Sequence, residues 1–375
     1  MGGAGQVAVE SKMNTTSVKK KIALLIPSLH VGGMERVMSE LANYFSTVPS
    51  TEVYMVLYGK DPTIYYDLSD NITVQLPNKG YSKSNRLFLT IKRFFYLRRT
   101  IKKTKPDSIL SFGTLWNRFV LISLFGLKYP VYISNRSNPN IKRSSFQEFL
   151  EKCFYPSAAG IIAQTDYAKT VYHSKKLNNN IQVIANPIRQ IEQYALEKEN
   201  AILYVGRLIK SKNLDRLIRI FSKLYHPDWK LIIVGGDAQK QDILSGLKEL
   251  VKELGVSDSV HFEGEKHNVN DYYLKSRIFA FTSSSEGFPN VVGEALSAGL
   301  PVVSYDCIAG PSDMITNGEN GFLVPTYNDS QFQERLQFLI NNEKRREILS
   351  KNAKLSMSKF SINTIGDKFL SFMSN

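Results

Sequence analysis

The chain has 375 residues, of which 43% are hydrophobic and 22% are charged. This length suits two domains with a core each, and the composition excludes a disordered protein. The formal net charge of +14 indicates an anionic partner: nucleic acid, phospholipid headgroups or a polyphosphate ligand. Two cysteines, Cys153 and Cys307, exclude a disulfide framework and indicate a reduced, cytoplasmic setting. No apolar run reaches the roughly 18 residues of a membrane-spanning helix.

Short apolar runs alternate with helical patterns along most of the chain. Residues 1–12 lack the features of a secretory signal and precede Met13, so we interpret them as a tag or a disordered tail. The apolar run at 19–29 ends in a glycine turn and a helical pattern at 34–45, and NAILYVGRL (200–208) restarts the same rhythm later. This alternation predicts α/β architecture with parallel sheets covered by helices.

The rhythm breaks once, in the polar segment NPIRQIEQYALEKEN (186–200), which we interpret as an interdomain linker. The sequence therefore predicts two Rossmann-like, doubly wound parallel-sheet domains, residues 13–190 and 191–356. Ligands of such sheets gather at the carboxyl ends of the strands, so the two domains are expected to face a ligand-binding cleft.

The stretch SSSEGFPNVVGEALSAGLPVV (283–303) carries two glutamates. Glu286 is expected on the loop before a helix that has Pro289 in its first turn, and Glu294 is expected inside that helix. Backbone N–H groups near Phe288 and Asn290 would form a seat for a diphosphate. The two acids suit hydroxyl groups of a sugar and of a ribose. The alternative is a pair of solvated surface carboxylates on an ordinary helix.

Two further strand–turn segments fit the same ligand. VGRLIKSKN (205–213) places Arg207 and Lys212 just after a strand, where they could reach the diphosphate, or else carry ordinary surface charge. LHVGGMER (29–36) contains Gly32 and Gly33, which would let a ligand approach backbone donors; a plain turn is the alternative. No Asp-x-Asp occurs, so no acid pair is available to present a metal, and neither a metal nor a cofactor is expected.

Residues 86–105, RLFLTIKRFFYLRRTIKKTK, are strongly basic. As a helix, they would pack one apolar stripe on the first domain: Leu87, Ile91, Phe94 and Ile101. The opposite face would carry basic residues interleaved with two exposed apolar ones: Arg86, Lys92, Arg93, Arg99, Lys103, Leu89 and Tyr96. Such a face suits an anionic membrane surface or a lipid diphosphate. The alternatives are a solvated basic face and a nucleic-acid-binding module, but no recognition motif supports binding to nucleic acid.

The order GGMER, VGRLIKSKN, SSSEGFPNVVGEALSAGLPVV, GPSDMI, NGFLVP resembles family 4 of the retaining glycosyltransferases over nearly all of residues 20–370. The resemblance implies a GT-B fold with the donor nucleotide sugar held mainly by the second domain. It also implies that residues 357–375 form a helix that crosses back to the first domain. Catalysis would be metal-independent, with retention by same-face attack.

The resemblance also implies residue roles. Arg207 and Lys212 match the cations of the donor diphosphate, Glu286 the acid at the transferred sugar, and Glu294 the acid at the ribose. The glycine loop near the reacting centre is matched by Gly33. The rest of the donor loop consists of Gly287, Phe288, Pro289 and Asn290. Many relatives carry a histidine where this chain has Asn135 and Arg136. Arg136 is expected either to contact an acceptor or donor phosphate or to pair on the surface.

The basic segment resembles that of enzymes that extend undecaprenyl-diphosphate-linked sugars, in particular the N-acetylgalactosaminyltransferases of O-antigen and lipid-linked oligosaccharide assembly. This implies transfer of N-acetylgalactosamine from a UDP-sugar, in α-1,3 linkage, to a polyprenyl-diphosphate-linked saccharide. The enzyme would be cytoplasmic and peripheral on the inner face of the plasma membrane. An alternative within the same fold is a non-transferring enzyme such as a UDP-N-acetylglucosamine 2-epimerase.

Overall fold

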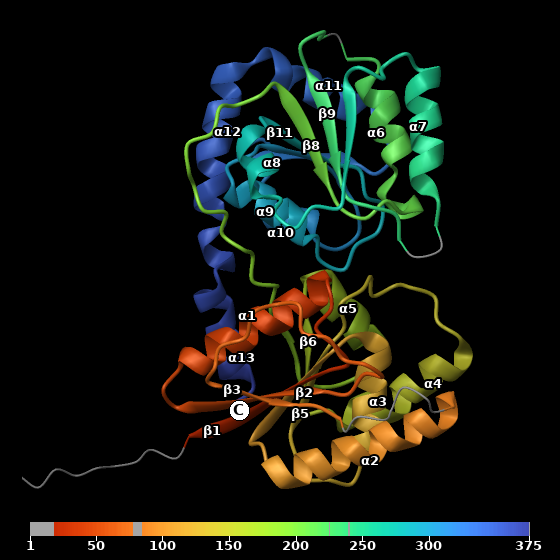
Figure 1. The fold of residues 1–375 in the computed structure, drawn as a ribbon, viewed down its shortest axis with the longest axis vertical. Coiled ribbons are helices and arrows are strands. Elements are labelled where there is room, and N and C mark those ends of the chain that lie inside the picture. Colours follow the sequence, from red (N-terminus) through yellow and green to blue (C-terminus); the bar gives the residue numbers. More distant parts are fainter. Residues whose placement is uncertain (1–18, 78–84, 225, 239–240, 375) are drawn as a thin grey trace, which may run out of the picture.

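A computed structural model describes residues 19–77, 85–224, 226–238 and 241–374. The predicted tag or tail, residues 1–12, lies outside the described residues. Figure 1 shows two α/β units, one above the other, and the last helices of the chain run in succession from the upper unit into the lower one. Each unit has one sheet in which every strand pair is parallel; the strand orders are β3-β2-β1-β4-β5-β6-β7 and β10-β9-β8-β11-β12-β13. The predicted pair of doubly wound parallel sheets is confirmed.

The first unit contains the seven-stranded sheet. Its central strands are buried on both faces, as expected for continuous apolar runs such as KKIALLI. The strands are β1 (Lys20–Ile26), β2 (Thr51–Leu57), β3 (Ile72–Gln75), β4 (Ser108–Phe112), β5 (Val131–Ser134), β6 (Gly160–Ala163) and β7 (Ile181–Val183). The helices are α1 (Gly33–Thr47), α2 (Arg86–Thr104), α3 (Thr114–Leu124), α4 (Ser145–Phe154), η1 (Tyr155–Ser157) and α5 (Asp166–Ser174).

The second unit contains the six-stranded sheet and most of the chain after residue 200. Its strands are β8 (Ala201–Val205), β9 (Lys230–Val234), β10 (Val260–Gly264), β11 (Ile278–Phe281), β12 (Val302–Asp306) and β13 (Gly321–Pro325). The helices up to β13 are η2 (Lys210–Lys212), α6 (Leu214–Phe221), α7 (Ile243–Glu253), α8 (Asn270–Lys275), α9 (Asn290–Ser297) and α10 (Pro311–Met314). The remaining helices are α11 (Asp329–Asn341), α12 (Glu343–Ser356), η3 (Ser358–Phe360) and α13 (Ile362–Phe372). No described helix is long and apolar enough to cross a membrane.

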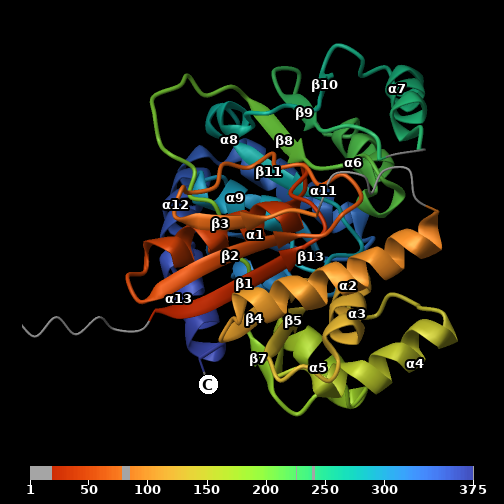
Figure 2. The ribbon, with the colours of Figure 1, turned by 60° about the horizontal axis from the view of Figure 1, so that its bottom comes forward.

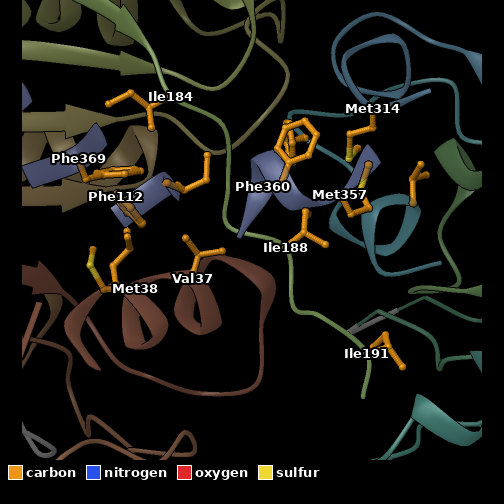
Figure 3. Close-up of a cluster of buried hydrophobic side chains, with 14 of the residues drawn as sticks. Val37, Met38, Phe112, Ile184, Ile188, Ile191, Met314, Met357, Phe360 and Phe369 are labelled. Carbon is orange, nitrogen blue, oxygen red and sulfur yellow. The ribbon is translucent and has the colours of Figure 1, made fainter. Parts of the chain in front are cut away.

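The two units share one apolar cluster, part of which is drawn in Figure 3. Helix α13 lies against the first unit, where the ring of Phe369 is 6.3 Å from that of Phe112 and the ring of Phe372 is 5.3 Å from that of Tyr132. Ile188 and Ile191 of the connecting segment belong to the same cluster. The predicted domain boundary between residues 190 and 191 falls inside it and stays a prediction.

Helix α2 buries a different face from the one predicted. Leu87 and Ile91 were expected to pack on the first unit, but both are exposed, and Leu89, expected outside, is buried. Leu89, Leu97 and Ile101 form a second apolar stripe, and this stripe is the one that packs on the sheet. The sequence offers apolar residues on both faces of this helix, so periodicity alone could not select the buried one. The exposed face therefore carries large apolar side chains as well as basic ones.

A glycine in α13 is required for its close contact with α1. A Cβ atom at Gly366 would lie 2.2 Å from Cδ1 of Tyr44. Gly366→Ala should therefore lower the free energy of unfolding by about 1–3 kcal/mol, the usual cost of overpacking. The matched control is Gly246→Ala in α7, where nothing lies within 4 Å of the added Cβ. That change should instead stabilise by about 0.5–1 kcal/mol through helix propensity. If urea denaturation gave the two variants the same change in the free energy of unfolding, the packing argument would be wrong.

An acid at the seam between the units should make stability depend on pH. Burial, followed by the charge of Asp166 on α5, raises the pKa of Asp313 on α10 to about 6. The folded chain therefore binds a proton more tightly than the unfolded chain, and stability falls as pH rises from about 4 to 6. Asp313→Asn should raise the free energy of unfolding by about 1–2 kcal/mol at pH 8 and leave it unchanged at pH 4. Asp258→Asn, at an exposed turn, controls for the lost charge. A gain of the same size at both pH values would refute the assignment.

Candidate active site

A cavity of about 360 Å³ lies between the two units. The second unit contributes the carboxyl ends of β8 and β9, the segment between β10 and α8, and α9. The first unit contributes α1, the segment before it and the segment between β2 and β3. The lining residues are Val31, Arg36, Tyr65, Tyr66, Arg189, Val205, Gly206, Arg207, Val234, Gly235, Gly236, Glu265, Lys266, His267, Val269 and Glu294. This position, at the carboxyl edge of a parallel sheet, is the one that the strand pattern predicts for a ligand.

The loop between β11 and α9 is held close to two neighbouring segments. The backbone N–H of Ser284 donates to the carbonyl of Ser211, at 2.9 Å. Gly310 has a φ of +121°, and a Cβ atom there would lie 2.1 Å from Cδ of Pro289. Helix α9 begins at Asn290, so Pro289 is the residue just before the helix rather than a member of its first turn. The loop is thus fixed with the first backbone N–H groups of α9 beside it.

Lys212 and Glu286 form an ion pair between the segments that follow β8 and β11, although neither of them lines the cavity. Both side chains are largely buried, with 14% and 12% of their surface exposed, so the alternative of solvated surface charges is wrong for this pair. The Lys212 ammonium also lies 5.3 Å from the centre of the Phe281 ring. Arg207 is exposed and lines the cavity. The sequence-predicted residues of the β8 and β11 ends therefore converge on one side of the cleft.

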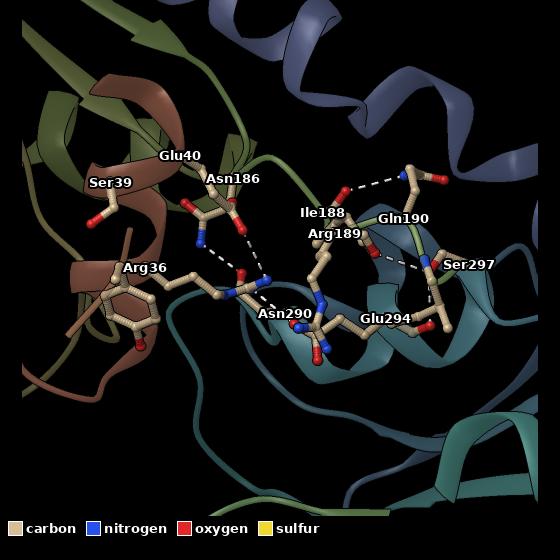
Figure 4. Close-up of polar contacts among 12 residues, drawn as sticks. Arg36, Ser39, Glu40, Asn186, Ile188, Arg189, Gln190, Asn290, Glu294 and Ser297 are labelled. Atoms are coloured by element: carbon tan, nitrogen blue, oxygen red, sulfur yellow. Dashed lines mark hydrogen bonds and ion pairs between the residues drawn. The ribbon is translucent and has the colours of Figure 1, made fainter. Parts of the chain in front are cut away.

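Glu294 is buried and makes contacts in both units (Figure 4). Its Oε1 lies 2.9 Å from Nη2 of Arg36 on α1, and its Oε2 accepts a hydrogen bond from the Tyr273 hydroxyl at 3.1 Å. Arg36 also binds Glu40, 3.3 Å away, and burial raises the pKa of Glu40. The surface alternative is wrong for Glu294 as well: this carboxylate joins the two units at the wall of the cavity.

The glycine turn before α1 faces the start of α9. A Cβ atom at Gly33 would lie 3.4 Å from Nδ2 of Asn290. The oxygen of the same Asn290 side chain accepts a hydrogen bond from Nδ2 of Asn186, at 2.8 Å (Figure 4). The turn therefore meets the donor loop across the cleft, and Asn186, at the start of the connecting segment, bridges the two units.

Arg136 is not a surface pairing partner. Its guanidinium stacks 3.4 Å from the centre of the Phe112 ring and donates to Asn186, and burial lowers its pKa to about 9. Its Nε and Nη2 atoms are buried without a hydrogen-bond partner among the described residues. The Arg136 backbone touches the donor loop, because a Cβ atom at Gly287 would lie 3.0 Å from the Arg136 carbonyl oxygen.

Other predicted residues lie elsewhere. The cavity is lined by no described residue of α2, so Lys92, Arg93, Tyr96, Arg99 and Lys103 are placed apart from it. Phe288 of the donor loop is buried, and the centre of its ring lies 6.1 Å from the centre of the Phe360 ring.

Sequence reasoning missed several residues of the cavity wall, among them Arg36, Tyr66 and Arg189. Arg36 belongs to the GGMER segment, one turn after the glycines. Its place in the first turn of the helix that begins at the glycine turn is the signal that could have identified it. No comparable signal marks Tyr66, which exchanges hydrogen bonds of 3.0 and 2.9 Å with the backbone of Gly32.

Both halves of the chain match known families. Residues 31–190 match "Glycosyltransferase Family 4", and residues 188–356 match "Glycosyl transferases group 1". An uncharacterized glycosyltransferase of Haemophilus influenzae is 30% identical over 353 residues, which cover 92% of this chain and 98% of the relative.

A second relative and a solved structure extend the comparison. The second relative, from Campylobacter jejuni, is 27% identical over 93% of this chain and 97% of its own length. It is named GalNAc-α-(1→4)-GalNAc-α-(1→3)-diNAcBac-PP-undecaprenol α-1,4-N-acetyl-D-galactosaminyltransferase. The structure of HepE from Anabaena in complex with UDP-glucose superposes with a TM-score of 0.79 at 18% identity, and covers 94% of this chain and 99% of HepE. The chain therefore belongs to the glycosyltransferases of the GT-B type, with a family 4 first half and a group 1 second half.

Proposed function

We propose that this glycosyltransferase moves N-acetylgalactosamine from a UDP-sugar to an undecaprenyl-diphosphate-linked saccharide, with retention of the anomeric configuration and without a metal. The proposal rests chiefly on the Lys212–Glu286 ion pair at the ends of β8 and β11 and on Glu294 at the wall of the interdomain cavity. These residues offer a cation for a diphosphate and two carboxylates for hydroxyl groups.

The donor diphosphate would be held by cations and backbone donors of the second unit. In the absence of a donor, Lys212 is paired with Glu286. A bound diphosphate would take over the ammonium group, and Arg207, exposed at the cavity, would reach the same oxygens. The N–H groups of Asn290 and Val292 already donate to the carbonyls of Phe288 and Pro289, so α9 would contribute chiefly through the positive end of its dipole. Because these groups are fixed before the reaction, they would stabilise the negative charge that develops on the leaving UDP.

The glutamates would bind the hydroxyl groups of the donor. Once Lys212 turns to the phosphate, the Glu286 carboxylate is free to accept hydrogen bonds from the transferred sugar. Glu294 uses one oxygen for Arg36 and the other for Tyr273, which leaves lone pairs for two ribose hydroxyls. Glu294 would thus bind the ribose while it remains tied to the first unit.

Transfer would proceed on one face of the sugar. The bond between the anomeric carbon and the diphosphate oxygen breaks, and the acceptor hydroxyl oxygen forms the new bond from the same side. Its proton passes to the departing phosphate oxygen, so no protein base is required. Gly33 and Asn290 flank the place where the two substrates would meet.

The acceptor would be bound by the first unit. The buried, unpartnered N–H groups of Arg136 suit an anion, and its backbone lies beside the donor loop. The basic groups of α2 suit the polyprenyl diphosphate at a cytoplasmic, inner-face membrane surface. The Campylobacter relative is named for a PP-undecaprenol substrate, which supports an acceptor of this class in O-antigen or related glycan synthesis. Binding of nucleic acid is not part of this proposal.

An epimerase that acts on UDP-N-acetylglucosamine remains the alternative reaction. It would use the same diphosphate site but would need no acceptor. Family membership favours transfer. An incubation without an acceptor distinguishes the two reactions, because only the epimerase would convert UDP-N-acetylglucosamine under that condition.

Removing the Lys212 cation should impair donor use. Lys212→Ala is expected to lower kcat/KM for the donor by about 10²–10³-fold, because a preorganised charge at the leaving group is lost. The matched control is Lys210→Ala, which removes an exposed lysine from the same 3₁₀ turn and should change turnover less than about twofold. Equal rates for the two variants in an assay of released UDP would contradict the assignment.

The reaction itself is tested by product mass. Purified protein is incubated with a panel of UDP- and GDP-sugars, a lipid-diphosphate monosaccharide acceptor and EDTA. We expect the mass of one N-acetylhexosamine to be added from UDP-N-acetylgalactosamine despite the chelator. Transfer of another sugar would correct the donor, whereas conversion of UDP-N-acetylglucosamine without an acceptor would establish the epimerase.

The stereochemistry is tested on the same product by NMR. An α anomer is expected from an α-linked donor, and a β anomer would rule out retention. The α-1,3 linkage implied by the resemblance stays a prediction, and the same spectra distinguish it from the α-1,4 linkage for which the Campylobacter relative is named.

A further inference from the structure

Large apolar side chains lie exposed on three neighbouring helices of the first unit. We call them the apolar rim: Leu87, Phe88, Ile91 and Phe95 of α2, Leu115 of α3, Ile141 just before α4, and Phe146 and Phe149 of α4. Helix α3 packs against both α2 and α4, and Figure 2 shows the three helices together at one side of the molecule. An exposed apolar surface of this extent marks an interaction site on a protein that is otherwise well packed.

The rim lies toward the carboxyl ends of the strands of the first sheet. In a parallel α/β sheet each helix runs antiparallel to its strands, so its first residues lie at the carboxyl ends of those strands. The rim residues occupy the first half of α2, the second residue of α3, and the entry and first half of α4. They therefore lie toward the carboxyl edge of the first sheet, and Figure 1 shows α2 along the end of the lower unit that is farther from the upper one.

Helix α4 does not need its exposed aromatic residues for folding. It is fixed by its buried acid, because Glu151 lies 3.0 Å from Nη1 of Arg118 and 2.9 Å from Nη1 of Arg143. The side chain of Ser144 caps its start. Phe146 is 68% exposed, and Phe149, one turn later, points to the same side. Among the residues that the structure describes, no aromatic ring or cation is placed against either of these rings, so they offer their surface to a partner outside the chain.

The charges around the rim favour an anionic lipid surface. Lys142 and Lys152 are exposed at the two ends of α4, and the exposed stripe of α2 continues beyond Phe95 with Arg99, Lys102 and Lys103. Glu148 is an exposed acid among them. Each basic residue near an anionic bilayer contributes about 1 kcal/mol, and aromatic and aliphatic side chains enter the headgroup region. A protein partner would have to match both the apolar rings and the surplus of positive charge.

We infer that α4 and α2 together form a lipid-docking surface, in which Phe146 and Phe149 enter the headgroup region of an anionic bilayer beside the apolar residues of α2. Docking there would hold the enzyme at the membrane that contains a lipid-linked acceptor. The inference deepens the proposed function in its choice of acceptor, but the docking itself needs neither donor nor transfer.

The first experiment measures binding to vesicles of phosphatidylethanolamine and phosphatidylglycerol by flotation. The double variant Phe146→Ser, Phe149→Ser should lose about tenfold or more in vesicle partition, because two apolar side chains no longer enter the bilayer. The matched control is Ile348→Ser, Leu355→Ser on α12, which removes two exposed apolar side chains from the second unit and should leave partition unchanged. Equal partition of wild type and the α4 variant would overturn the inference.

A second variant keeps the test independent of folding defects. Phe149→Trp retains the apolar character, and its fluorescence should shift to shorter wavelength when anionic vesicles are added. The parent protein, which has two tryptophans, gives the background. An emission spectrum that does not change beyond this background would also overturn the inference. If the serine variant instead changes the oligomeric state and keeps its vesicle binding, the rim is a protein interface and the lipid assignment is wrong.

Activity separates this inference from the proposed function. The α4 serine variant should transfer to a short-chain, water-soluble acceptor at the wild-type rate and lose transfer only to a long-chain acceptor in vesicles. An equal loss on both acceptors would place the defect in the enzyme rather than in docking. If no transfer occurs with any acceptor, the proposed function fails, while flotation still decides the docking surface.

Discussion

The buried ion pair between Arg36 and Glu294 is the constraint on which the shape of the cleft depends. Taking two charges out of water costs several kcal/mol for each, and only close pairing with further hydrogen bonds offsets that cost. Here Arg36 comes from the first unit and Glu294 from the second. Arg36 also pairs with Glu40, and Glu294 also accepts a hydrogen bond from Tyr273. Opening the cleft would leave both charges without their main partner, so the charges themselves favour the closed arrangement.

Packing reinforces the same arrangement from the other side of the seam. Helix α13 leaves the second unit and buries Phe369 and Phe372 against the first, and the apolar cluster continues through Ile188 of the connecting segment. The chain therefore crosses the seam twice, and the cavity of about 360 Å³ is lined by Arg36 and Glu294 of the ion pair and by Arg189 of the connecting segment. A ligand in this cavity would contact groups that both units hold in place, so its affinity and the closure of the cleft would be coupled.

Pattern reasoning succeeded where a residue's place along a strand determines its place in space. Lys212 follows β8 and Glu286 follows β11, and since these strands are neighbours, their ends meet. It failed where two faces of one helix were equally apolar: Leu87 and Leu89 of α2 exchanged their predicted environments. Arg36 was missed because its partner lies 258 positions away along the sequence, in the other unit, and no local period reports such a contact. The path of the last helix came from family resemblance, since nothing in its own sequence specifies which unit it covers.

The two units differ in how many of their polar groups have hydrogen-bond or ion-pair partners and in how much apolar surface they expose. In the second unit, the acids expected at the donor already have cationic or hydroxyl partners, which a donor would share or replace. In the first unit, the Nε and Nη2 atoms of Arg136 are buried without a described hydrogen-bond partner, and the rim of α2, α3 and α4 leaves large apolar side chains exposed. Unsatisfied donors and exposed apolar surface both cost free energy in an isolated molecule. A single ligand class offsets both costs, because a polyprenyl diphosphate brings an anion and an apolar chain together. The surface chemistry of the first unit thus argues for a lipid-linked acceptor independently of the relatives.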